Sequence, residues 1–358
     1  MEAILSRFSL QGRPLTCERY GQGHINLTYL VTTDSGRRYI LQRLSRAAFH
    51  DIPALMRNVA AVTGFLAARS TDPRQTLHLI PTRDGENWVR DEAGEAWRVY
   101  DYVEDSICLQ VPESPEDLYE SAIAFGSFQR MLADFPAETL HETIPNFHNT
   151  PDRYRIFRET LAADPMGRAA GIQREIDFVL AREEEAGALQ RMRESGELPL
   201  RVTHNDTKLN NILFDEATKQ GLCVIDLDTI MPGLSLYDFG DAIRFGAKTA
   251  KEDEADLSKV SLSLALFEAY TDGYLSACAE ALTKAEVDHL AFSAKLMTYE
   301  CGVRFLTDYL CGDTYFKIDY PDHNLVRARN QFRLVEEIER MLPEMEAIVQ
   351  RIYQKKTA

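Results

Sequence analysis

Lysine is missing from the first 207 residues of this chain, and the first one is Lys208. Over all 358 residues, 40 Lys and Arg stand against 56 Asp and Glu, which gives a formal net charge of −16. Proteins that bind nucleic acid or anionic membranes need a basic face. The composition therefore excludes both classes of partner. An anionic ligand would need a local cluster of positive charge or of backbone N–H groups.

Long apolar runs and paired cysteines are missing as well. No segment approaches the roughly 18 uncharged apolar residues of a membrane-spanning helix. Glu2 and Arg7 interrupt the N-terminal segment too early for a signal peptide. The cysteines show neither a C-x-x-C pair nor metal-ligand spacing: Cys17, Cys108, Cys223, Cys278, Cys301 and Cys311. Scattered thiols of this kind are typical of the reducing cytoplasm, where we expect the protein.

Strand patterns dominate the first part of the chain and helical patterns the rest. Alternation and turn residues predict strands over 28–33, 38–43, 76–80, 88–89 and 97–102. Apolar spacing predicts helices over 58–68, 114–135, 152–162, 172–193, 253–280, 284–310 and 323–353. Between the helices, residues 200–245 have the pattern of loops and short strands. We therefore expect an α+β protein with two parts, residues 1–104 and 105–358.

The non-helical stretch carries the pattern H-x-D-x-x-x-x-N, formed by His204, Asp206 and Asn211. An apolar strand then leads to Asp226. Kinases transfer phosphoryl groups with this arrangement. We expect Asp206 to orient the acceptor hydroxyl and accept its proton. Asn211 and Asp226 offer hard oxygen ligands, which suit Mg²⁺ held against nucleotide phosphates.

Neighbouring side chains extend this constellation. Lys208 follows the expected base by two residues and can reach the transferred γ-phosphate. His204 belongs to the catalytic pattern, and we expect it to hold the loop by hydrogen bonds. Asp228 has two interpretations, a metal contact or a carboxylate that accepts backbone N–H groups in its turn. Asp238 precedes a helical pattern and is expected to cap that helix or to brace the loop.

These strings resemble the aminoglycoside phosphotransferase and choline kinase family. In that family the catalytic loop is followed by I-D, a glycine and a further aspartate, which here are Ile225-Asp226, Gly233 and Asp238. More narrowly, H-N-D-T-K-L-N-N, V-I-D-L-D-T-I-M-P-G-L-S-L-Y-D-F-G-D and R-F-L-T-D-Y-L are similar to bacterial N-acetylhexosamine 1-kinases. The resemblance implies a protein-kinase-like bilobal fold. A small antiparallel sheet with one helix forms the N-lobe, and a mainly helical C-lobe follows.

The resemblance places nucleotide contacts in the first part. Gly21, Gly23 and His24 lie just before the first long strand, where glycines let backbone N–H groups approach phosphates. An ordinary hairpin turn is the alternative for this segment. Asp101 and Val103 end the last strand of the sheet. There the family has its hinge, whose backbone hydrogen-bonds adenine.

A lysine that should contact the phosphates from the third strand is missing. Gln42 stands at the expected place with Arg43 beside it. Alternation puts these two side chains on opposite faces of the strand, so only one of them can face the nucleotide. Either Arg43 or Lys208 must then bring positive charge to the phosphates.

The acceptor site should lie in the helical part beside Asp206. Arg304 and Asp308 stand at i and i+4 on one predicted helix face. They are either a surface ion pair or two groups that bind sugar hydroxyls. Tyr315 and Phe316 nearby could stack on a sugar ring, although aromatic side chains are also common in cores.

The resemblance implies an enzyme that, with Mg²⁺, transfers the γ-phosphoryl group of ATP to the anomeric hydroxyl of a free N-acetylhexosamine. Its partners are then ATP and a small sugar, and its product is the sugar 1-phosphate. Another acceptor is an alternative: an aminoglycoside, a choline-like amine or homoserine. A catalytically inactive nucleotide-binding regulator is a further alternative, which the missing lysine favours and the intact Asp206, Asn211 and Asp226 oppose.

Overall fold

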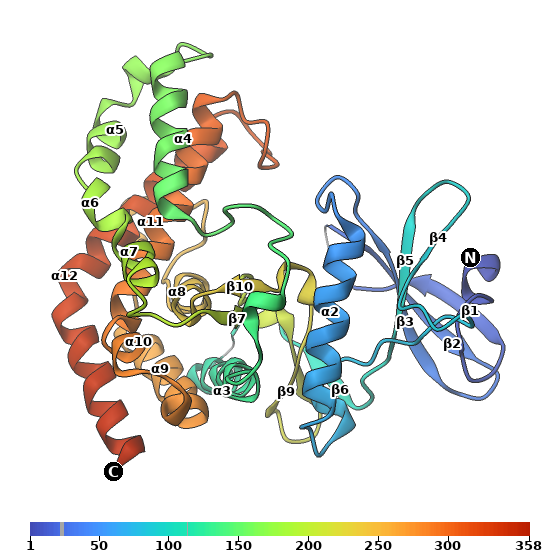
Figure 1. The fold of residues 1–358 in the computed structure, drawn as a ribbon. Coiled ribbons are helices and arrows are strands. Elements are labelled where there is room, and N and C mark those ends of the chain that lie inside the picture. The colour runs from blue at the N-terminus through green and yellow to red at the C-terminus, as the bar shows by residue number, and fades with distance from the viewer. Residues whose placement is uncertain (22–24, 113) are drawn as a thin grey trace.

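A computed structural model describes residues 1–21, 25–112 and 114–358. It has an antiparallel sheet in its N-terminal part and is mainly helical in its C-terminal part (Figure 1). The five strands of the sheet lie in the order β1 (Pro14–Arg19), β2 (Leu27–Thr33), β3 (Arg38–Leu44), β5 (Ala96–Asp101) and β4 (Val89–Arg90). The expected α+β fold class is confirmed.

Alternation along the strands lets this sheet bury both of its faces. On one face, Tyr39 and its same-face neighbours pack against the segment that contains the short helix α1 (Glu2–Leu5). On the other face, Leu44 and Tyr100 pack against α2 (Ile52–Ala67). The side chain of every second residue in β3 and β5 therefore points toward α2.

Two sequence predictions for this part are corrected. α2 is longer than the predicted helix over 58–68 because it begins after Asp51, whose side chain accepts a hydrogen bond from the backbone N–H of Ala54 at 2.8 Å. The predicted strand over 76–80 is wrong, since that segment forms only an isolated bridge and two backbone hydrogen bonds with β5. β1 was not predicted because its mostly exposed side chains show no apolar alternation.

Helices make up most of the C-terminal part. They are α3 (Pro115–Met131), α4 (Thr150–Ala163), α5 (Gln173–Leu180), α6 (Glu183–Ala186), α7 (Ala188–Glu194), α8 (Ser235–Gly246), α9 (Leu264–Cys278), α10 (Lys284–Asp288), α11 (Leu290–Leu310) and α12 (His323–Thr357). α3 and α9 pack very closely. A Cβ atom at Gly126 would lie 2.8 Å from the backbone oxygen of Tyr274, so only glycine fits there.

Three helix predictions differ from the structure. The predicted helix over 172–193 is broken into α5, α6 and α7, with Gly187 between the last two. The predicted helix over 253–280 begins only at Leu264, because the chain before it doubles back through an isolated bridge. The stretch 200–245 is not free of helix, since α8 occupies its end.

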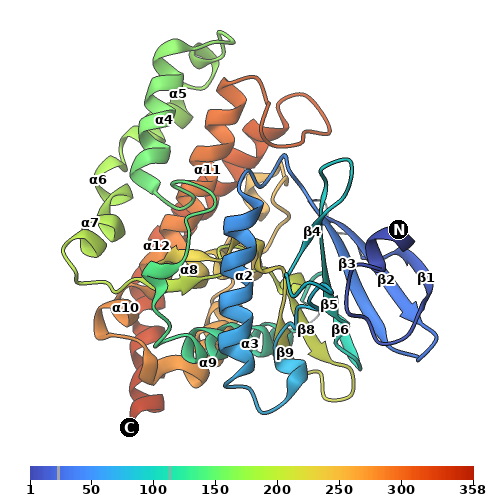
Figure 2. The ribbon, with the colours of Figure 1, turned by 45° about the vertical axis from the view of Figure 1, so that its right-hand side comes forward.

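Short strands flank the loops that lie between the two parts. β7 (Arg201–Thr203) pairs with β10 (Met231–Gly233), and β8 (Ile212–Asp215) lies between β6 (Ser106–Cys108) and β9 (Gly221–Val224). α2 reaches this region as well (Figure 2). The amide of Asn58 on α2 donates to the carbonyl of Ile230 at 3.0 Å.

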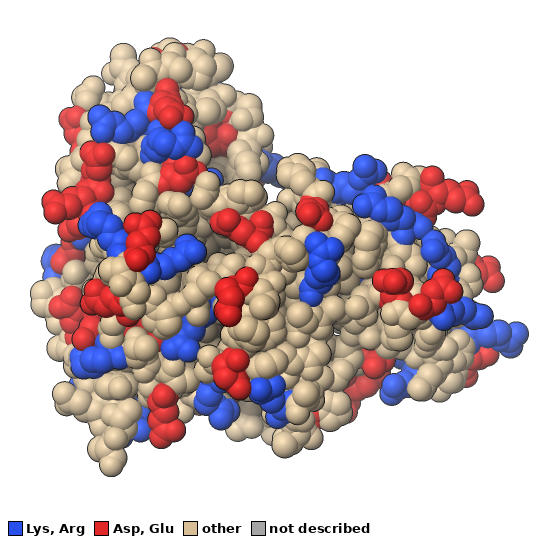
Figure 3. Space-filling model, viewed as in Figure 1, with Lys and Arg blue, Asp and Glu red and all other residues tan. Residues whose placement is uncertain are grey.

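Charges of both signs are mixed on one face of the molecule. On the face drawn in Figure 3, Lys and Arg alternate with Asp and Glu, and the surface is indented between the two parts. Among the described residues, no helix is long and apolar enough to cross a membrane.

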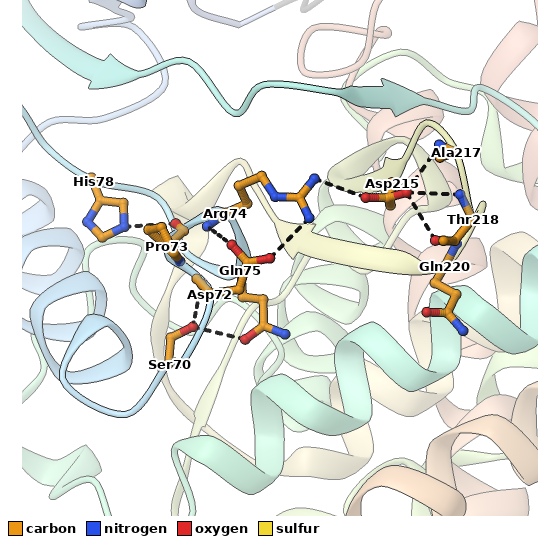
Figure 4. Close-up of polar contacts among 10 residues, drawn as sticks. All are labelled: Ser70, Asp72, Pro73, Arg74, Gln75, His78, Asp215, Ala217, Thr218 and Gln220. Carbon is orange, nitrogen blue, oxygen red and sulfur yellow. Dashed lines mark hydrogen bonds and ion pairs between the residues drawn. The ribbon is translucent and has the colours of Figure 1, made fainter.

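An ion-pair network at the surface also joins the two parts (Figure 4). Arg74 donates to Asp215, at the end of β8, at 2.9 Å and to Asp72 at 3.1 Å. Hydrogen bonds from residues 217 and 218 hold the Asp215 carboxylate, and together with Arg74 they lower its pKa to about 2.

Candidate active site

Buried contacts fix the loop that follows β7. His204 is 0% exposed, its Nε2 lies 2.8 Å from the carbonyl oxygen of Ile225, and its ring meets Phe125 and Phe128 edge-on. The backbone N–H of Asp206 donates to His204 Nδ1 at 3.2 Å. His204 therefore accepts at Nδ1 and donates from Nε2, and it braces two segments of the loop region from inside.

A carboxylate from α8 braces the same loop. Asp238 accepts hydrogen bonds from the backbone N–H groups of His204 at 2.9 Å and Asn205 at 2.8 Å, and from the amide of Gln129. Asn205 needs this support because its φ of +65° lies in the left-handed region. Asp238 sits inside the first turn of α8 rather than at its cap, so it is a loop brace.

Three side chains of the motif meet in the loop. Lys208 Nζ lies 2.6 Å from Asp206 Oδ1. Asn211 Nδ2 donates to the backbone oxygen of Asp206 at 2.8 Å and to its Oδ2 at 3.1 Å. Burial lowers the pKa of Lys208, but the charge and hydrogen bond of Asp206 outweigh it and raise that pKa overall. The predicted lysine and amide are thus both within hydrogen-bonding distance of the predicted base.

Asp226 approaches this group from the next turn. Its backbone is left-handed, with φ of +59°, and the neighbouring N–H of Ile225 donates to the carbonyl oxygen of Asn211 at 2.9 Å. Asp226 is exposed to solvent, although nearby protein atoms partly desolvate its carboxylate. This desolvation, with the charges of Asp228 and Asp206, raises the pKa of Asp226 to about 6.

The side-chain oxygen atoms of Asn211 and Asp226 could bind a divalent metal. Within the described residues, neither Asn211 Oδ1 nor the Asp226 carboxylate has a hydrogen bond or ion pair. No group of three His, Cys, Asp or Glu side chains in the described part of the chain forms a complete metal site. Two protein oxygens suit Mg²⁺, which usually takes its other ligands from phosphates and water.

Asp228 faces the sheet and not this opening. Its Oδ1 lies 2.5 Å from Nη1 of Arg98 on β5, and its Oδ2 accepts a hydrogen bond from Asn26. Both Arg98 and Asp228 are buried, at 1% and 4% exposure. Asp228 therefore does not bind the backbone N–H groups of its own turn, and it ties that turn to the N-terminal part.

Gln42 and Arg43 lie on opposite faces of β3, as alternation predicts. Gln42 is directly opposite Arg98 in register, and its Oε1 accepts hydrogen bonds from Arg98 at 2.8 and 2.9 Å. Arg43 is opposite Trp97, on the face away from α2, and its charge acts on Asp91. The prediction that Arg43 contacts the nucleotide is therefore wrong, because its side chain points to the other side of the sheet.

The remaining nucleotide candidates surround the end of the sheet. Gly21 has a φ of +71° and open space around it, whereas Gly23 and His24 lie outside the described residues. Burial raises the pKa of Asp101, against the lowering charge of Arg37. Within the described part of the chain, the backbone N–H of Val103 has no hydrogen-bond partner. It remains available to a ligand.

Arg304 lies on α11 among three aromatic rings. Its guanidinium is 5.5 Å from the ring centroids of Phe147 and Phe316 and 5.9 Å from that of Tyr315, which is 70% exposed. No described residue forms a hydrogen bond or ion pair with this guanidinium. A partly buried cation with a free fork of donors is therefore available beside an exposed ring.

Asp308 does not pair with Arg304. Its two oxygens accept hydrogen bonds from the backbone N–H groups of Thr314, Tyr315 and Phe316 and from the amide of Asn324, all at 2.8–2.9 Å. The carboxylate is only 5% exposed. The prediction that it binds a sugar hydroxyl is corrected: its acceptor positions are used to shape the turn that carries the aromatic side chains.

Charge links the Arg304 region to the catalytic loop. The charges of Asp241 and Arg244 act on Lys208 and also on Cys301, which Arg304 influences as well. Lys208 and Lys248 lie 5.1 and 5.4 Å from the centroid of the Phe245 ring. The end of α8 therefore connects the loop with α11.

Residues 16–277 match the model of a phosphotransferase enzyme family, known as APH. The chain belongs to this family. The resemblance to aminoglycoside phosphotransferases is thereby confirmed at the level of the family, whose members are small-molecule kinases that use ATP.

Solved structures agree with this phosphotransferase in fold. A microcompartment-associated aminopropanol kinase is 17% identical over 96% of both chains, with a TM-score of 0.60. An aminoglycoside phosphotransferase from Alicyclobacillus acidocaldarius subsp. acidocaldarius DSM 446 is 15% identical over 98% of this chain and 96% of the other, with a TM-score of 0.66. An amicoumacin kinase in complex with AMP-PNP and Ca²⁺ is 14% identical over 94% and 91%, with a TM-score of 0.58. At these identities the likeness shows the shared protein-kinase-like fold.

The sequence analysis of this phosphotransferase missed two groups at the site. Arg98 could have been found from register, because a strand that pairs with 38–43 puts it opposite Gln42. Lys248 carries no motif, and only the way the chain doubles back after α8 brings it near Lys208.

Proposed function

We propose that this phosphotransferase transfers the γ-phosphoryl group of ATP to the anomeric hydroxyl of free N-acetylglucosamine or N-acetylgalactosamine. The observation that carries this proposal is the unpaired guanidinium of Arg304 between aromatic rings. A sugar offers hydroxyl and carbonyl oxygens to such a donor fork, and its apolar face suits an exposed ring such as that of Tyr315.

The charges around Arg304 disfavour an amine as acceptor. Four carboxylates of this region are already engaged. They are Asp308 by its turn, Glu300 by His148 and Thr150, and Asp241 and Glu252 by Arg244. Lys248, like Arg304, has no ion-pair partner among the described residues. A cationic acceptor would meet like charge here, whereas a neutral sugar would not. Among neutral sugars we choose an N-acetylhexosamine, because the catalytic sequence motifs resemble those of N-acetylhexosamine 1-kinases.

Asp206 is the residue we assign to the acceptor hydroxyl. It orients the oxygen and accepts the proton as that oxygen bonds to the γ-phosphorus and the bond to the ADP oxygen breaks. ADP leaves with the electron pair of that bond. Lys208 pairs with Asp206, and its ammonium group can turn toward the transferred phosphoryl group and stabilise the negative charge there. His204 keeps the loop in shape without touching substrate.

Asn211 and Asp226 are the residues we assign to Mg²⁺, which when bound neutralises charge on the nucleotide phosphates. Both residues have free oxygens and lie near Asp206, which supports this assignment. For the nucleotide we assign the backbone around Gly21 and the free N–H of Val103, with Asp101 beside it at the hinge. Residues 1–104 are then the nucleotide-binding lobe and residues 105–358 the acceptor lobe. We place the enzyme in the cytoplasm, where ATP and free thiols occur together.

A panel of acceptors tests the proposal. With ATP and Mg²⁺, ADP release should follow addition of N-acetylglucosamine or N-acetylgalactosamine. The methyl glycoside of the same sugar, whose anomeric oxygen is blocked, should be inactive. Ethanolamine, an aminopropanol and an aminoglycoside are tested as alternative acceptors, since proteins of similar structure are named as kinases or phosphotransferases of such compounds. Turnover of an amine in place of the sugars would contradict the proposal.

Arg304→Ala tests the acceptor site directly. We expect the sugar KM to rise roughly tenfold, since a hydrogen bond from a charged group contributes about 1.5 kcal/mol or more. The KM for ATP should stay unchanged. Arg158→Ala on α4 is a matched control, because Arg158 lies on the surface with Glu183. An unchanged sugar KM in Arg304→Ala would remove Arg304 from the site.

A further inference from the structure

The most deeply buried cation of the sheet belongs to no motif. Arg98 is 1% exposed and lies on the face of β5 that points toward α2, in a lobe that has no lysine. A buried charge is stable only when it is paired and hydrogen-bonded. The role of Arg98 can therefore be inferred from the groups that it contacts.

Protein groups occupy the donors of Arg98. Nε and Nη2 donate to Gln42 Oε1 at 2.9 and 2.8 Å, and Nη1 contacts Asp228 Oδ1 at 2.5 Å and Met56 Sδ at 3.8 Å. Gln42 is oriented in turn, because its Nε2 donates to the hydroxyl of Thr28 at 3.1 Å. A guanidinium so enclosed cannot also reach a phosphate without leaving these partners.

Asp228 is therefore held from the N-terminal part on both of its oxygens. Oδ2 accepts from Asn26, whose own Oδ1 accepts the backbone N–H of Ser45 at 3.0 Å. Asp228 stands in the short 3-10 turn Leu227–Thr229, directly after Asp226. The other end of that turn is tied to the catalytic loop, since the Thr229 hydroxyl donates to the carbonyl oxygen of His204 at 2.6 Å.

We infer that Arg98 is a positioning residue that fixes the Asp226 turn to the sheet through Asp228. The left-handed backbone of Asp226 is anchored on one side by the sheet and on the other by the loop of Asp206. Arg98 lies opposite Gln42, the residue at the place expected for the missing lysine, but it acts on the Asp226 turn instead of on phosphates. This inference rests on the proposed role of Asp226 as a Mg²⁺ ligand.

Binding measured with and without metal tests it. The variants are Arg98→Met, Arg98→Lys and Asp228→Asn, with Arg43→Met as a matched control on the other face of the sheet. Calorimetry gives the affinity for ATP in excess chelator and at increasing free Mg²⁺. Arg98→Met should raise the Mg²⁺ concentration for half-maximal binding roughly 10-fold or more, the usual effect of losing a partner that orients a metal ligand. Metal-free ATP affinity should change less than about twofold. Arg98→Lys keeps the charge but loses the fork of donors, so it should restore only part of the Mg²⁺ response.

Coupling between the two partners completes the test. The double variant Arg98→Met/Asp228→Asn should be no worse than Arg98→Met alone, because both changes break one interaction. Where Arg98→Met does not fold, Gln42→Ala gives the same readout. It leaves the buried ion pair in place but frees the guanidinium, so a smaller rise in the Mg²⁺ requirement is expected.

Three results would overturn the inference. If Arg98→Met weakens metal-free ATP binding as strongly as metal-dependent binding, Arg98 contacts phosphates. If Asp228→Asn raises the Mg²⁺ requirement and neither Arg98→Met nor Gln42→Ala does, Asp228 is itself a ligand. Additive losses in the double variant would also exclude action through Asp228. Failure of the proposed function is a separate outcome, in which Asp226→Asn leaves the Mg²⁺ response of the parent protein intact.

Discussion

The Asp206 carboxylate is held by partners of two kinds. Lys208 contributes positive charge at 2.6 Å, and the Asn211 amide fixes the second oxygen at 3.1 Å. A carboxylate oriented in this way can accept a proton without a large change in its surroundings. These contacts give the assignment of Asp206 a direct consequence for kinetics.

Asp206→Asn should lower kcat by roughly 10²–10⁴ because an amide cannot accept the proton. The nucleotide affinity should stay within about twofold, since the loop geometry and the metal ligands are unchanged. Steady-state kinetics and calorimetry check both values. Asp84→Asn, in an exposed turn, is the control. A kcat above a tenth of the parent value would show that Asp206 is not the base.

Asp226 makes stability depend on pH. Its pKa is raised from the ordinary 3.8 to about 6 by enclosure and by the charges of Asp228 and Asp206. A raised carboxyl pKa means that the stabilising protonated form is full below about pH 4 and is lost as pH rises through 6. The ionised form of Asp226 therefore destabilises the nucleotide-free protein at neutral pH.

Asp226→Asn should for this reason unfold at a slightly higher temperature than the parent at pH 8, since solvent screens part of the effect at this exposed residue, and the difference should shrink toward pH 5. Thermal unfolding without nucleotide and with chelator measures it, with Asp84→Asn beside it. A variant that unfolds at the same temperature as the parent, or lower, throughout this range would contradict the account of Asp226.

Spacing in the sequence predicted the residues that meet in the loop. Asp206, Lys208 and Asn211 are close because they lie within six positions of one chain segment. Arg98 depends instead on which strands pair, and pairing is set by the whole sheet. Arg43 was misassigned because alternation left two choices, and the packing of α2 decides between them.

Among the elements, α8 connects the two halves of the site. Its first turn holds the loop of Asp206 through Asp238. Phe245 in its last turn lies close to both Lys208 and Lys248, and Lys248 follows the end of the helix. α11 packs along α8 and carries Arg304 toward the same region. Arg304 is therefore positioned by helix packing, with loops adding the aromatic side chains around it.

Changes in the turn after α11 should weaken binding of the acceptor and leave binding of ATP nearly unchanged. Asp308→Asn removes a charged acceptor from the backbone N–H groups of Thr314, Tyr315 and Phe316 and puts a donor near them. We expect the sugar KM to rise several-fold and the free energy of unfolding to fall by about 1–3 kcal/mol. Asp319→Asn, in the exposed part of the same segment, is the control. An unchanged sugar KM would show that this turn does not shape the acceptor site.

Elements with strong end signals were predictable. The Ser114 capping box begins α3 where the sequence places it, and the β2–β3 hairpin follows from its turn. Helices α5 to α7 were joined in the prediction because apolar spacing continues across their breaks. β1 was missed because an edge strand with exposed side chains gives no periodic signal.

At the scale of the molecule, a few buried and surface contacts hold the sheet against the helices. They are the pair of Arg98 with Asp228, the hydrogen bond of Asn58 to Ile230 and the pair of Arg74 with Asp215. The first two reach the segment that carries Asp226, and the third reaches the β8–β9 turn. The fold thus holds the Asp226 turn from both sides.

Net charge and local charge lead to different expectations for the acceptor. The whole chain carries −16, which alone would suit a cationic acceptor. The region around Arg304 and Lys248 has its carboxylates engaged and two cations unpaired among the described residues. Only the folded structure reveals this, because Arg304 and Lys248 lie more than fifty positions apart in the sequence.

Phosphorus NMR of the product tests the central claim most directly. The enzyme is incubated with ATP, Mg²⁺ and either N-acetylglucosamine or N-acetylgalactosamine. Transfer to the anomeric oxygen predicts a new phosphomonoester signal split into a doublet by the single anomeric proton. A triplet, which two protons on carbon 6 would produce, would contradict the anomeric assignment. Absence of any sugar phosphate, together with turnover of an amine-bearing acceptor, would contradict the sugar kinase itself.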